Sequence, residues 1–108
     1  MAAGAQGVTV TTAWVEFREI LARHIKELER GDPERLAVEW FFLRYLKRLE
    51  KHAQATAVAD DLSGPMRGFI RFYVDTVDPR SALAERFERV LAAHRHALRM
   101  AHGSAPAR

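Results

Sequence analysis

The stretch AVEWFFLRYLKRL, residues 37–49, decides what kind of fold this chain can form. It sets four large apolar side chains next to one another at positions 40–43 and then adds basic residues. Its apolar residues follow helical spacing rather than strand alternation, and they cover more of the helix surface than one narrow stripe. We therefore predict a helix whose first half is contacted by other helices from several sides.

Turn signals on both sides of this stretch divide the chain into helices. GDPE (31–34) and VDPR (77–80) each offer an aspartate that can cap a helix and a proline suited to its first turn. SGP (63–65) marks a third turn, with Pro65 in the first turn of the helix that follows. These signals predict four helices, at about residues 12–30, 33–55, 65–77 and 79–102.

The four segments together predict an all-α fold. The one alternating stretch, GVTVT (7–11), is too short to build a sheet. Short connections favour antiparallel neighbours, so we expect a compact antiparallel four-helix bundle. It should form a single helical domain over residues 11–103, with a disordered arm at 1–10 and a disordered tail at 104–108.

Composition excludes several classes of protein. The chain has 108 residues, which is enough to bury a core, and it has no cysteine, which excludes disulfides and thiolate metal sites. Its beginning lacks the features of a secretory signal, and no apolar run approaches the ~20 residues of a membrane-spanning helix. We expect a cytoplasmic protein that does not enter a membrane.

The sequence predicts neither a cofactor nor a metal site nor an enzyme. Five histidines occur, but no Glu-x-x-His or His-x-x-x-His pair is present. His24 and His94 lie on or near apolar faces, where a histidine bonded to a backbone group or a carboxylate is expected. Glu39 lies among apolar residues; we favour a partly buried ion pair with an arginine over a general acid of raised pKa. Capping or ending a helix is the expected role of Asp60 and Asp61.

A basic stripe follows the aromatic cluster on the second helix. Its members, at i, i+3, i+4 and i+7, are Arg44, Lys47, Arg48 and Lys51. Beside it, Phe41 and, on the third helix, Phe72 are the aromatics for which a small bundle offers the least interior space. The alternatives are that the core buries every aromatic and that the stripe is simply a solvated face.

Several short stretches resemble a known family. In chain order they are Arg23-His24-Ile25, Trp40-Phe41-Phe42-Leu43, Asp60-Asp61-Leu62, Ile70-Arg71 and Ala82-Leu83-Ala84. The chain resembles in these pieces the small CowN proteins, which sustain nitrogen fixation by protecting nitrogenase from carbon monoxide. It departs from them in having no cysteine, a basic balance, and AVE where the family has Asn-Pro before the tryptophan. The resemblance implies a non-catalytic bundle that docks on a large enzyme near Trp40 and Phe41.

Our leading hypothesis is a non-enzymatic protein that binds another protein with an acidic surface, as an accessory or protective factor. The residues expected to contact this partner are Trp40, Phe41, Arg44, Lys47, Arg48, Lys51 and Phe72. The same surface could also bind a second copy of this chain, so self-association is a further alternative. The alternative is a nucleic-acid-associated regulator that uses the basic stripe; against nucleic acid, the sequence shows no helix-turn-helix with a base-reading helix.

Overall fold

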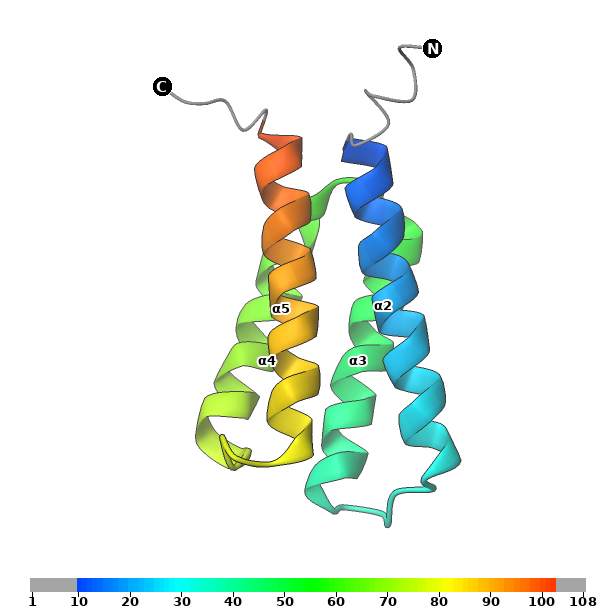
Figure 1. Cartoon of the computed structure of the whole chain (residues 1–108), viewed down its shortest axis with the longest axis vertical. Coiled ribbons are helices and arrows are strands. Elements are labelled where there is room, and N and C mark those ends of the chain that lie inside the picture. The colour runs from blue at the N-terminus through cyan, green and yellow to red at the C-terminus, as the bar shows by residue number, and fades with distance from the viewer. Residues whose placement is uncertain (1–9, 103–108) are drawn as a thin grey trace.

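The computed structural model describes residues 10–102, and this range contains helices and no strand. The elements are α2 (Val10–Arg30), α3 (Val38–Ala55), the short 3₁₀-helix η1 (Ala59–Leu62), α4 (Ser63–Thr76) and α5 (Ala82–Ala101). The four α-helices run alternately down and up the long axis of the molecule (Figure 1). The predicted all-α bundle is therefore confirmed. Apart from Val10, the predicted arm and the predicted tail lie outside the described residues.

The start of α3 differs from the prediction. The helix begins at Val38 rather than at Pro33, and Asp32 therefore does not cap it. Asp32 and Leu36 have φ angles of 48° and 71°, and a residue with positive φ cannot continue a right-handed helix. Leu36 thus separates the Asp-Pro segment from α3. Ala37 occupies the N-cap position with extended backbone and without a side-chain cap.

The start of α5 is also later than predicted, at Ala82 instead of Pro79. Asp78 accepts a hydrogen bond from the backbone N–H of Arg80 at 2.9 Å, and the Ser81 hydroxyl donates to the carbonyl of Asp78 at 2.7 Å. The aspartate therefore stabilises a turn that precedes the helix. By contrast, α4 begins earlier than predicted, at Ser63, because η1 leads directly into it; Pro65 lies in its first turn as predicted.

The core lies where α2 packs against α3 and α5. The largest fully buried side chains come from all five elements: Phe17, Leu21, Phe42, Leu46, Leu49, Leu62, Phe69 and Val90. Each such side chain stabilises the fold by roughly 1.5–3 kcal/mol on burial. None of the described helices is long and apolar enough to cross a membrane.

Aromatic rings attach α4 to the rest of the bundle. Phe69 of α4 is fully buried and packs edge-on against Phe42 of α3, with ring centroids 5.1 Å apart, and against Phe87 of α5 at 5.2 Å. Tyr73 stacks parallel to Phe87 at 3.9 Å. Phe72, one of the predicted partner-binding residues, is half-buried.

Candidate protein-binding site on helix α3

The outward face of α3 carries an open groove of about 860 Å³. All of its lining side chains belong to α3: Phe41, Arg44, Tyr45, Lys47, Arg48, Lys51, His52 and Ala55. The first and last of these lie fourteen residues apart, which is about 21 Å along a helix. The groove therefore follows nearly the whole helix and contains five of the seven residues predicted from the sequence.

An incompletely buried aromatic pair lies at the N-terminal end of the groove. Trp40 is half-buried and Phe41 is 37% exposed, and their rings meet edge to face with centroids 4.9 Å apart. Leu36, just before the helix, is 63% exposed. Leu36 and Phe41 occupy the two positions whose apolar side chains often pack together at a helix start, yet both leave much surface in water. The bundle encloses neither ring of the pair.

The basic residues of α3 differ in their contacts. Lys47 forms an ion pair with Glu29 of α2, with Nζ and Oε2 2.8 Å apart. The guanidinium carbon of Arg44 lies 4.8 Å from the centre of the Trp40 ring, a cation–π arrangement. Within residues 10–102, no carboxylate forms an ion pair with Arg44, Arg48 or Lys51. Three exposed cations of the groove are thus without an ion-pair partner in the described range.

Sequence reasoning missed three residues of the groove: Tyr45, His52 and Ala55. Positions 41, 45, 48, 52 and 55 lie on one helix face, so the spacing could have shown them; the stripe was defined by charge alone. Phe72 does not line the groove. It stacks on Tyr45 at 4.8 Å and so supports the groove from α4. Trp40 is absent from the lining too, and it contacts the groove through Phe41 and Arg44.

Glu39 does not form the predicted buried ion pair. Its side chain is exposed, and no ion pair connects it to any residue in the described range. Of the apolar residues near it, Phe42 and Leu43 are buried, whereas Leu36 and Glu39 itself are exposed. The general-acid alternative, which required a glutamate sunk among apolar side chains, loses its basis as well.

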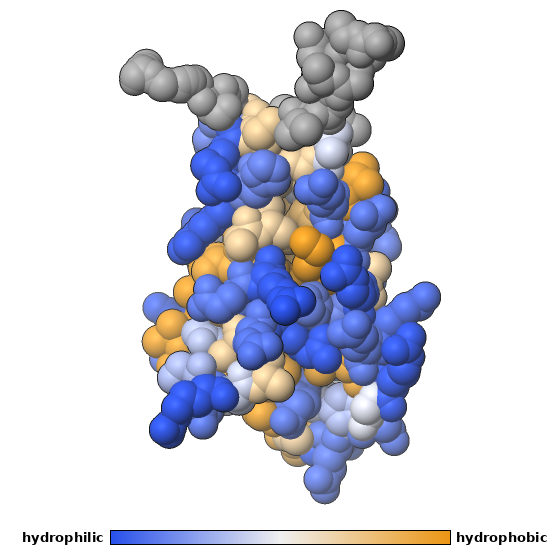
Figure 2. Space-filling view, viewed as in Figure 1, coloured by the Kyte–Doolittle hydropathy of each residue, from blue (hydrophilic) through white to orange (hydrophobic). Residues whose placement is uncertain are grey.

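The opposite, α2–α5 side of the molecule is covered largely by hydrophilic side chains, with apolar ones showing in scattered patches (Figure 2). Between these two helices, one guanidinium nitrogen of Arg86 donates to His24 Nδ1 at 2.7 Å and to Glu27 Oε1 at 2.6 Å. His24 is only 4% exposed. The hydrogen-bond partner of His24 is therefore an arginine, and the prediction of a backbone or carboxylate partner is wrong for this histidine.

His24 is held in its neutral form. Burial and, second, the charge of Arg86 lower its pKa from the ordinary value of 6.5. Because Nδ1 accepts from Arg86, the ring proton of the neutral form lies on Nε2. That atom is buried and has no hydrogen-bond partner among the described residues. The same arginine lowers the pKa of Glu27 by a side-chain hydrogen bond.

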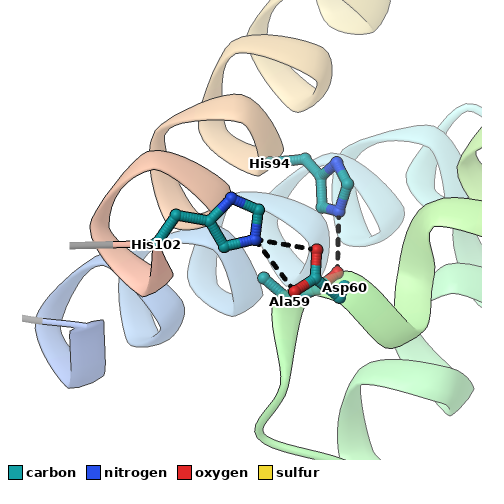
Figure 3. A network of polar contacts seen from close by, with 4 residues as sticks. All are labelled: Ala59, Asp60, His94 and His102. Carbon is teal, nitrogen blue, oxygen red and sulfur yellow. Dashed lines mark hydrogen bonds and ion pairs between the residues drawn. The ribbon is translucent and has the colours of Figure 1, made fainter. Parts of the chain in front are cut away.

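Two histidines, His94 and His102, connect the C-terminal end of α5 to η1 (Figure 3). His94 is buried and its Nε2 lies 3.1 Å from the carbonyl oxygen of Ala59, so Nε2–H donates to the backbone as predicted. Burial lowers the pKa of His94, and the Ala59 carbonyl opposes this effect. His102 contacts both carboxylate oxygens of Asp60, at 2.9 and 3.1 Å. Within the described range, no group of three or more histidine, aspartate or glutamate side chains is arranged so that it could hold a metal ion.

The comparisons with known proteins give no relative. No protein-family model matches the sequence, and neither a curated protein nor a solved structure is significantly similar to the chain.

Proposed function

We propose that the protein acts by binding another protein through the outward face of α3, without chemistry of its own. One observation carries the proposal: a groove that joins an exposed phenylalanine to three cations without a carboxylate partner in residues 10–102. Aromatic residues and arginine are enriched at protein interfaces and supply most of their binding energy. Phe41, Arg44 and Arg48 supply both residue types within two turns.

The charge of the groove selects an acidic partner. Arg44, Arg48 and Lys51 have the same sign, and the lining contains no aspartate or glutamate. Opposite charge on the partner speeds encounter and excludes wrong partners, because like charges at an interface are costly. The partner surface therefore has to combine carboxylates with an apolar contact.

The proposed role is that of an accessory or protective factor of a larger enzyme. The resemblance of the Trp40-Phe41-Phe42-Leu43 cluster to the CowN proteins makes nitrogenase the first enzyme to test. This choice of enzyme rests on that resemblance alone. The existence of a protein-binding face rests on the groove.

Replacing Phe41 with glutamine tests the proposal. Because Phe41 is partly in water, the variant should keep the helical circular dichroism spectrum while its affinity for the captured partner falls by about tenfold or more, as at an interface hot spot. Affinity capture from the native cell, followed by a binding titration with the purified partner, measures this. Val74→Gln is the matched control, since Val74 is 70% exposed on α4 and does not line the groove. Unfolding of the Phe41 variant, or unchanged binding, would contradict the proposal.

Nucleic-acid binding is the alternative that the same cations support. Phosphates would replace carboxylates opposite Arg44, Arg48 and Lys51, and affinity would then fall steeply with salt. Retention of the protein on immobilised DNA or RNA at increasing salt distinguishes the two functions. Elution at low salt argues against the nucleic-acid alternative.

A further inference from the structure

We infer that the part of the partner that α3 binds is an acidic amphipathic helix of about four turns, lying lengthwise in the groove. This inference rests on the proposed function and specifies the chemistry and shape of the partner. The groove length sets the size of the partner segment. About 21 Å of α3 is matched by about fourteen residues of a second helix.

The spacing of the three cations favours a helix over a strand. Along α3, Arg48 lies about 6 Å and Lys51 about 10.5 Å from Arg44, because a helix rises about 1.5 Å per residue. An antiparallel partner helix places carboxylates at these same intervals when they stand at i, i+3 and i+7 of its own sequence. A strand presents side chains on one face every ~6.6 Å, so it reproduces the first interval and misses the second.

Backbone hydrogen bonding leads to the same partner. The N–H and C=O groups within α3 are already paired inside the helix, so its surface cannot bond an added strand. An extended segment buried on α3 would leave its own backbone groups without hydrogen-bond partners, which is destabilising for each buried group. A helix satisfies these groups internally and exposes only side chains to the groove.

The apolar end of the groove specifies an anchor residue. Phe41 is 37% exposed, and Leu36 beside the start of the helix is 63% exposed, whereas the far end of the groove carries the small side chain of Ala55. A large apolar residue of the partner therefore belongs opposite Phe41. The two helix dipoles interact favourably when the partner helix runs antiparallel to α3. Read along such a partner, the complementary sequence pattern is Glu-x-x-Glu-x-x-x-Glu-x-x-Leu.

A labelled peptide with this pattern, filled with alanine and glutamine, is the probe, and its fluorescence anisotropy on titration with the full-length protein gives the affinity. The comparison peptide has the same composition plus a central proline, which prevents a continuous helix. We expect the helical peptide to bind at least about tenfold more tightly. Equal affinities would overturn the helical partner while leaving protein binding by acidic segments, and so the proposed function, intact.

A charge exchange fixes the register. Arg48→Glu should weaken binding of the peptide by about tenfold, and changing the central glutamate of the peptide to lysine should restore it, as expected for a direct charge pair. Arg95→Glu on α5 is the matched control, because it changes the net charge equally and Arg95 is exposed outside the groove. Absence of restoration would overturn this register. A DNA duplex that binds more tightly than the peptide, and is lost with Arg48→Glu, would overturn both the inference and the proposed function.

Discussion

At the scale of single residues, His24 and His94 couple the stability of the bundle to pH. Burial is the first cause that lowers the pKa of each from 6.5. As the pH falls through 6.5, both histidines become protonated in the unfolded chain, whereas in the folded protein they stay neutral to lower pH. The unfolded state then binds more protons, so the free energy of unfolding decreases as the pH falls from 6.5 to the lowered pKa values of the folded protein. The slope is at most about 1.4 kcal/mol per pH unit for each histidine.

Urea denaturation at pH 7.5, 6.5 and 5.5 measures this prediction. The free energy of unfolding should be highest at pH 7.5 and decrease toward pH 5.5. In the double variant His24→Gln/His94→Gln the decrease should be smaller, because neither amide titrates. An equally steep decrease in the double variant would show that other groups cause it.

The burial of these histidines could be predicted from the sequence, but only one of their partners could. Both positions lie on apolar helix faces, which is a local property. The partner of His24 is Arg86, sixty-two residues further along the chain. Which side chain of α5 reaches His24 depends on how far the two helices slide along each other, and no local spacing encodes that offset.

At the scale of helices, α4 depends on a few aromatic rings for its position. Phe69 is fully buried between Phe42 and Phe87. Phe69→Ala should therefore lower the free energy of unfolding by about 3–5 kcal/mol, through lost burial and a remaining cavity. Phe41→Ala, which removes the same atoms from a partly exposed site, should cost only about 1–2 kcal/mol. Chemical denaturation of the two variants measures this difference. A similar loss in the free energy of unfolding at both positions would show that Phe41 belongs to the core.

Apolar periodicity correctly predicted that the four α-helices exist, whereas the capping signals did not predict where α3 and α5 begin. A capping aspartate and a first-turn proline say only where a helix can begin. At 31–37 the chain instead makes turns, with Leu36 at a φ of 71°, and α3 starts after Ala37 without a side-chain cap. The four-residue η1 was missed because so short a segment shows no periodicity. The partial exposure of Phe41 agrees with the sequence argument, while the stacking of Phe72 on Tyr45 depends on the packing of α4.

At the scale of the whole molecule, the charge of α3 bears on self-association. A twofold dimer through this face would pack α3 antiparallel against its copy, because such an interface uses the same patch on both subunits. With the twofold axis at Arg48, the middle of the groove, Arg48 would lie opposite its own copy and Arg44 opposite His52, one residue from Lys51, without a carboxylate in the groove lining to separate the charges. Like charges across an interface are destabilising, most of all at low salt, where screening is weakest.

We therefore expect that the protein does not dimerise through α3, and that lowering the salt does not promote association. Sedimentation velocity at two protein concentrations about twentyfold apart, in low and in moderate salt, measures this. The sedimentation coefficient should not increase with concentration in low salt. Arg48→Glu is the informative variant. In a twofold dimer of the variant alone, glutamate would face glutamate at position 48, whereas in a mixed dimer with wild-type protein glutamate would face arginine. A wild-type dimer that Phe41→Gln weakens would contradict the prediction and would make a second copy, rather than an acidic helix, the occupant of the groove.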